Sequence, residues 1–135
     1  MNVTIIDVHG GLLGVQIIKE IKSGISGAVI TAIGTNAIAT AAMLKAGAGK
    51  GATGENPVIV ACRKADVIIG PVGIVIADAL DGEITPKMAV AVGQADAVRI
   101  LVPMNKCDNF VAGIKSASMN ELVEDVIEKL KALDK

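Results

Sequence analysis

The feature that most constrains the fold of this chain is a set of short apolar runs that end in glycine or proline. The runs at 3–8 and 66–70 contain few polar residues and show no regular alternation of apolar and polar side chains. Strands of this kind are buried on both faces, which is typical of a parallel sheet covered by helices. The length of 135 residues suits one domain with its own core, so we expect residues 1–135 to form a single domain.

Helical segments separate the apolar runs along the chain. We expect strands at 3–8, 28–33, 51–53, 66–70 and 98–102, with a sixth edge strand at 110–114. Helices are expected at 11–22, 36–46, 58–65, 85–95 and 119–133, with a helical turn at 71–80. The β-branched residues in 58–65 also fit a strand, and the sequence leaves this alternative open. The alternation predicts a Rossmann-like, doubly wound α/β fold. Its sheet is mostly parallel, with five or six strands, helices on both faces and the first strand in the centre.

Helix starts carry local signals that support these assignments. The residues that can accept hydrogen bonds from the first N–H groups of a helix are Asn36, Asn56 before Pro57, Thr85 before Pro86, and Ser118 with Glu121 as a capping box. Proline after a capping residue fits the first helical turn, where no backbone N–H is needed. Four of the expected helices therefore have defined starting points.

Charge and composition exclude several classes of partner. The formal net charge is −1 and Phe110 is the only aromatic residue, so the chain has neither a basic surface nor a stacking platform for nucleic acid. The most apolar stretches are too short or too polar to span a membrane. Cys62 and Cys107 match no metal-binding spacing, and no secretion signal precedes them, which predicts a cytoplasmic protein with reduced thiols and no metal site.

Small and polar residues follow the expected strands, at the edge where ligands of open parallel sheets bind. The candidate cofactor-binding residues are Gly10, Gly11, Gly14, Thr35, Asn36, Gly54, Gly70 and Asn105. The candidate catalytic residues are His9, Glu55 and Lys106. This set suits a small phosphorylated ligand, and a nucleotide or dinucleotide is the candidate cofactor.

The first of these loops is an incomplete dinucleotide fingerprint. Gly11 and Gly14 fill the second and third positions of G-x-G-x-x-G, but His9 stands at the first. The fingerprint also expects an acidic residue after the second strand, to bind the ribose, but Thr35 and Asn36 stand there. Free N–H groups at the start of the next helix still favour an anion, and we expect a phosphate at Gly10 and Gly11. In the alternative interpretation, the glycines only allow the helix to pack closely on the sheet.

His9 is the only histidine, and its position permits a role as phosphate acceptor or general base. The segment D-V-H-G-G-L-L-G at 7–14 is locally similar to the phosphorylated histidine loop of mannose-type phosphotransferase IIA domains. A loop histidine without chemical function is the alternative. For Asp7, orientation of the glycine loop is favoured over catalysis.

Longer motifs resemble a known family across nearly the whole chain. They are G-T-N-A-I-A-T-A-A-M-L-K-A-G-A (34–48), G-A-T-G-E-N (51–56), A-D-V-I-I-G-P-V-G-I (65–74), G-E-I-T-P-K-M (82–88) and P-M-N-K-C (103–107). They resemble an uncharacterised family of short bacterial proteins, catalogued as a domain of unknown function. The resemblance implies a Rossmann-like fold and brings no activity with it. The first loop of that family is D-G-Q-G-G-G-I-G, from which this chain departs by non-conservative changes at Val8, His9 and Leu12.

Three functional hypotheses fit these observations. The first is a protein that binds a nucleotide or another phosphorylated metabolite at the carboxyl edge of the sheet, either as an enzyme or as a binding module. The second is a phosphotransfer enzyme with a transient phosphohistidine at His9. The third is a non-catalytic oligomeric subunit with a structural or regulatory role. The 52% hydrophobic content and the mean hydropathy of +0.59 predict a homo-oligomer, with a two-fold dimer favoured.

Overall fold

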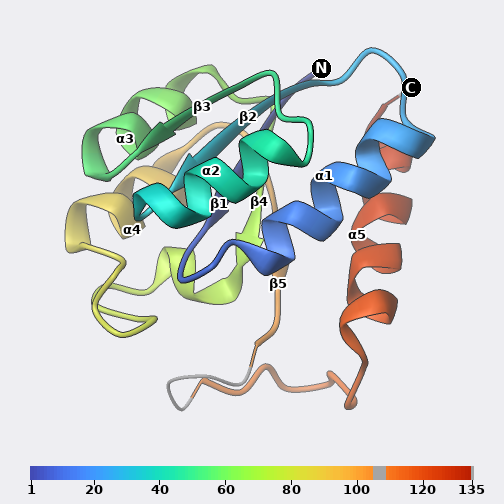
Figure 1. Cartoon of the computed structure of the whole chain (residues 1–135). Coiled ribbons are helices and arrows are strands. Elements are labelled where there is room, and N and C mark those ends of the chain that lie inside the picture. Colours follow the sequence, from blue (N-terminus) through green and yellow to red (C-terminus); the bar gives the residue numbers. More distant parts are fainter. Residues whose placement is uncertain (105–108, 135) are drawn as a thin grey trace.

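Five parallel strands form one sheet in the computed structural model, which describes residues 1–104 and 109–134 (Figure 1). The strands are β1 (Asn2–Asp7), β2 (Val29–Gly34), β3 (Lys50–Thr53), β4 (Val67–Pro71) and β5 (Val98–Val102). Their order is β3-β2-β1-β4-β5, and every neighbouring pair is parallel. The strand order thus reverses between β1 and β4, which confirms the predicted doubly wound, Rossmann-like arrangement with the first strand in the centre.

Helices cover both faces of the sheet. The helices α1 (Leu12–Gly24), α2 (Ala37–Lys45) and α5 (Met119–Leu133) pack on one face, together with Ile5 of β1. The helices α3 (Glu55–Lys64) and α4 (Pro86–Gln94) and the short 3₁₀ helix η1 (Val72–Val75) pack on the other face, together with Ile6. Successive side chains of a strand point to opposite faces, so β1 contributes to two separate hydrophobic cores.

Three of the four predicted helix starts are confirmed. The Asn36 side chain accepts a hydrogen bond from the N–H of Ala39, and the Thr85 side chain accepts one from the N–H of Met88. A capping box of Ser118 and Glu121 begins α5, as predicted. The segment at 58–65 belongs to a helix and not to a strand, because α3 lies on the sheet and buries its apolar side.

The third helix begins differently from the prediction. Gly54 stands at its N-terminal boundary with a φ of 104°, a conformation that favours glycine. Its N–H donates to the carbonyl of Gly34, which ties this turn to the end of β2. The chain therefore enters α3 before Asn56, which lies in the first turn and does not cap the helix.

Two further expectations are wrong. The segment at 110–114 is not a strand: Phe110 is 80% exposed, Gly113 has a φ of 86°, and β5 forms that edge of the sheet. The helical turn expected through Leu80 ends at Val75. Beyond it Asp78, Leu80 and Asp81 adopt left-handed backbone conformations, which a helix excludes, and Leu80 turns into the core.

The sequence also predicts that no segment spans a membrane and that the protein is a homo-oligomer. Across the described ranges, no helix is both long and apolar enough to cross a membrane. The two-fold dimer stays a prediction.

Gly70 of β4 lies where the central strands β1 and β4 approach each other closely. A Cβ atom at this position would lie 2.5 Å from the carbonyl oxygen of Ile6, and backbone cannot give way cheaply. We expect Gly70→Ala to lower the free energy of unfolding by about 1–3 kcal/mol, measured by urea denaturation.

Gly93→Ala is the matched control for this substitution. A Cβ atom at Gly93 would meet nothing within 4 Å, and the residue lies in α4. Alanine is preferred to glycine within helices by roughly 0.5–1 kcal/mol, so this variant should be slightly more stable than the wild type. Equal effects of the two substitutions would contradict the close approach of β1 and β4.

Candidate functional site

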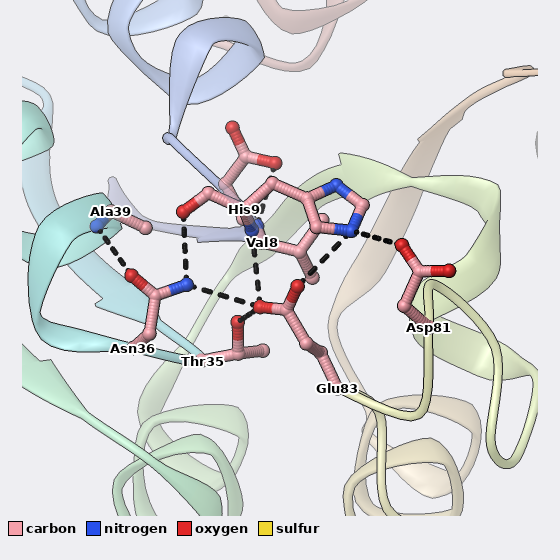
Figure 2. Close-up of polar contacts among 8 residues, drawn as sticks. Val8, His9, Thr35, Asn36, Ala39, Asp81 and Glu83 are labelled. Atoms are coloured by element: carbon pink, nitrogen blue, oxygen red, sulfur yellow. Dashed lines mark hydrogen bonds and ion pairs between the residues drawn. The ribbon is translucent and has the colours of Figure 1, made fainter.

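The candidate site lies at the carboxyl edge of the sheet, where three segments meet. The loop after β1 supplies His9, and the loop after β2 supplies Thr35 and Asn36. The segment at 76–85, which connects η1 to α4, supplies Asp81 and Glu83. Figure 2 shows His9, Thr35 and Asn36 around the carboxylate of Glu83, with Asp81 against the ring of His9. The site therefore bridges the reversal of strand order between β1 and β4, the expected ligand position in this fold.

Three donors converge on a single oxygen of Glu83. Its Oε1 atom accepts hydrogen bonds from the backbone N–H of His9 at 3.1 Å, from Nδ2 of Asn36 at 3.0 Å and from the hydroxyl of Thr35. The second oxygen, Oε2, lies 3.1 Å from Nε2 of His9. The two loops thus present a donor set, which we call the Glu83 cradle: the N–H of His9, Oγ1 of Thr35 and Nδ2 of Asn36.

The cradle controls the ionisation of Glu83. Partial burial raises its pKa, but the hydrogen bonds from Thr35, the backbone of His9 and Asn36 outweigh that effect. The positive ring of His9, when protonated, acts in the same direction as these hydrogen bonds. As a result, the pKa of Glu83 lies below its ordinary value of 4.5. Glu83 is therefore a carboxylate at neutral pH.

Asn36 links the site to the start of α2. Its Oδ1 accepts from the N–H of Ala39 at 2.9 Å, while its Nδ2 donates to the carbonyl of His9 at 2.9 Å and to Glu83. The capping hydrogen bond fixes the amide, so its NH₂ group is held toward the site. One side chain thus caps the helix and contributes a donor to the cradle.

Asp7 fixes the glycine loop between β1 and α1 by accepting hydrogen bonds from its backbone. Its side chain is buried and accepts hydrogen bonds from the N–H of Val8 at 2.8 Å and of Gly14 at 2.7 Å. Burial raises the pKa of Asp7 above 3.8, and the two backbone hydrogen bonds oppose that effect. Because Asp7 occupies the N–H of Gly14, one of the first-turn donors expected to hold a phosphate is already used.

His9 lies between two carboxylates. Its Nε2 atom is 3.0 Å from Oδ2 of Asp81 and 3.1 Å from Oε2 of Glu83. The other ring nitrogen points away from both acids in Figure 2, and no contact to it is found within 1–104 and 109–134. A histidine held through one nitrogen by a carboxylate, with its other nitrogen accessible, has the arrangement of a nucleophile or general base.

The remaining predicted site residues serve other purposes or lie elsewhere. Gly11 has a φ of 77°, and a Cβ atom there would approach the backbone of Ala39. Gly14 packs against Met43. Gly54 bounds α3, and Gly70 lies within β4. Glu55 begins α3 and makes no polar contact with the Glu83 cradle in the part of the chain that is described. Gly10 is exposed, and Asn105 and Lys106 lie outside the described residues.

Asp81 and Glu83 are the functional candidates that sequence reasoning missed. Neither directly follows a strand, so the rule that places ligands after strand ends does not select them. The signal that could have found Glu83 is the motif G-E-I-T-P-K-M at 82–88, which holds an acid just before a capped helix. Only the tertiary structure carries this segment across the sheet to the loops after β1 and β2.

The fold and the site define an α/β protein of the doubly wound class, with a polar cluster where the strand order reverses. The chain belongs to the family described as a domain of unknown function, DUF3842, whose profile matches residues 2–135. No curated protein and no solved structure gives a significant match to the chain. Among the described residues, no group of three or more histidine, cysteine, aspartate or glutamate side chains is arranged to hold a metal ion.

The lowered pKa of Glu83 predicts a pH-dependent contribution to stability. A group whose pKa is lower in the folded state stabilises the fold above its unfolded value, here 4.5, and this contribution is lost as the pH falls through the folded value. We expect Glu83→Gln to lower the free energy of unfolding by about 1–2 kcal/mol at pH 7, measured by urea denaturation. The difference from wild type should shrink progressively below pH 4.5.

Asp81→Asn is the control, because the Asp81 side chain is 83% exposed and, among the described residues, its polar contact is with His9 alone. Its effect at pH 7 should be small. A loss for Glu83→Gln that is the same at pH 3 and pH 7 would contradict the charge-based explanation.

Proposed function

We propose that the protein binds a small phosphorylated metabolite, such as a nucleotide, at the Glu83 cradle. The observation that carries this proposal is the convergence of three donors on one oxygen of Glu83. A phosphate oxygen accepts hydrogen bonds in the same manner as a carboxylate oxygen, so the carboxylate serves as an internal stand-in for a ligand anion. The cradle is also located at the reversal of strand order.

The ligand would displace the Glu83 side chain from the three donors, while the backbone of Glu83 would stay in place. The neighbouring Leu80 and Ile84 are buried in the core, which anchors the segment at 76–85. The Glu83 side chain is 24% exposed, so rotation toward solvent would free the three donors. Repulsion between a phosphate and the carboxylates of Glu83 and Asp81 would drive this rotation.

Backbone groups beside the cradle would add to the binding. A Cβ atom on Gly10 would meet nothing within 4 Å, so a ligand can approach the loop there. The N–H groups of Leu12 and Leu13 at the start of α1 have no acceptor among residues 1–104 and 109–134. The partial positive charge of a helix N-terminus favours a second anionic group of the ligand at this position.

Two substitutions with opposite expected effects test this proposal. Gly10→Val should weaken binding of AMP, ADP and inorganic phosphate at least 10-fold, because the side chain blocks the approach but has room in the fold. Glu83→Ala should strengthen binding several-fold, because it removes the internal competitor. Isothermal titration calorimetry measures both effects.

Gly93→Ala should leave binding unchanged and serves as control. Gly11→Val is unsuitable because its φ of 77° and its contact with Ala39 would disturb the fold. Absence of binding by both wild type and a folded Glu83→Ala protein would contradict the proposal.

Phosphoryl transfer through His9 is a second candidate function. The accessible Nδ1 atom would attack the phosphorus atom of a donor protein's phosphohistidine. The donor's N–P bond would break, and its electron pair would return to the donor ring. The phosphorylated His9 ring carries a positive charge, which the carboxylates of Asp81 and Glu83 at Nε2 would stabilise. The specific observation in favour is this pairing of Nε2 with two acids.

We expect acid-labile phosphate on His9 after incubation with a phosphohistidine donor, detected by mass spectrometry at neutral and acidic pH. His9→Gln should abolish the label, whereas Asp81→Asn should lower its yield. Label that persists in His9→Gln, or a cellular role that His9→Gln retains in full, would exclude His9 as the phosphate carrier.

A further inference from the structure

A cavity lies between the sheet and α3, and none of the residues of the Glu83 cradle lines it. It has a volume of about 440 Å³ and is bordered by residues of β1, β2 and β3 and by one side of α3. Its polar lining residues are Asn2, Thr4, Thr31, Lys50, Asn56 and Lys64. Cavities of this size are within the range of small-molecule sites, about 300–1,000 Å³.

Thr4 and Thr31 place two hydroxyls in this cavity. Both residues are at matched positions of β1 and β2, and Thr31 is in turn matched with Lys50 of β3. Thr4, Thr31 and Lys50 thus form a row across the three strands. This row is on the same face of the sheet as Ile6 and Ile33, which pack beneath α3. A polar row thus crosses three strands on a face whose next row is apolar.

The hydroxyl of Thr4 has no hydrogen-bond partner among the residues that the structure describes. Thr4 is 3% exposed, yet it forms no side-chain hydrogen bond within the described ranges. Among the described residues, every side-chain nitrogen or oxygen that is fully buried has a hydrogen-bond partner. The Thr4 hydroxyl, which has none, is therefore not fully buried and is reached from the cavity that Thr4 lines. Buried polar groups in native proteins are nearly always paired, and valine would fill this position at lower cost. The Thr4 hydroxyl pairs with no described residue and opens onto the cavity, so it is available to a ligand there.

The charge of the cavity indicates what kind of ligand it takes. Lys50 and Lys64 line it, neither forms an ion pair with a described residue, and none of its described lining residues is acidic. The rest of the lining is mostly apolar, with Val29, Ile33, Pro57, Val60 and Ala61. We propose that this cavity binds a small organic acid with an aliphatic body. Its carboxylate pairs with the lysines and the Thr4 and Thr31 hydroxyls.

Hexanoate is the probe for this site, with 1-hexanol and hexylamine as neutral and cationic analogues. We expect hexanoate to shift the backbone amide NMR signals of Thr4 and Thr31 in a saturable way, and to bind at least 10-fold more tightly than either analogue. Equal affinity of the alcohol, or unchanged signals at both threonines, would overturn the proposal.

Thr4→Val separates a ligand-binding hydroxyl from a structural one. It should raise the melting temperature, because valine removes a hydroxyl that pairs with no described residue from a core position, and weaken hexanoate binding at least 5-fold. If Thr4→Val misfolds, Thr31→Val provides the same test of affinity. Lys64→Gln should also weaken binding, whereas Lys19→Gln on α1 should not. Gly10→Val and Glu83→Ala should leave hexanoate affinity unchanged, which distinguishes this cavity from the Glu83 cradle. Full affinity in the threonine variants would overturn the assignment.

Discussion

Burial of β1 on both of its faces is the constraint on which the rest of the structure depends. Ile5 and Ile6 are consecutive, 0% and 1% exposed, and point to opposite sides of the sheet. A strand of this kind needs a neighbour on each edge and a layer of helices on each face. The strand order β3-β2-β1-β4-β5 meets this need. It also creates the reversal beside β1 where His9, Thr35 and Asn36 come together.

In the proposed function, a ligand anion takes the place of the Glu83 carboxylate at this reversal. The site contains the carboxylates of Asp7, Asp81 and Glu83, and His9 is the titratable base among them. Asp7 is satisfied by two backbone N–H groups and holds the loop in shape. Glu83 instead uses donors that belong to two other segments, and its removal would leave these donors unpaired. An anion with more oxygens than a carboxylate would satisfy them and reach the start of α1 as well.

The two proposed sites use different parts of the same strands for different physical reasons. At the carboxyl ends, backbone and side-chain donors are concentrated in loops, and an internal acid satisfies them. On the face that α3 covers, Thr4 occupies a core position, has no side-chain partner among the described residues and opens onto a cavity lined by two lysines. Glu83 satisfies the donors of the first site, whereas the second site contains a hydroxyl that no described residue satisfies.

The sequence by itself determined the fold class, the central position of β1 and, to within one or two residues, most element boundaries. β5 and α5 match their predicted ranges, and α2 and α4 begin at their predicted caps, because buried runs and caps are local signals. It also determined that His9, Thr35 and Asn36 would lie at one edge, since parallel strands share their carboxyl ends. Only the tertiary structure decided that Glu83 reaches them, because the path of the segment at 76–85 depends on Leu80 and Ile84 entering the core. The early start of α3 at Gly54 and the absence of a strand at 110–114 likewise depend on contacts between distant segments, which local pattern does not encode.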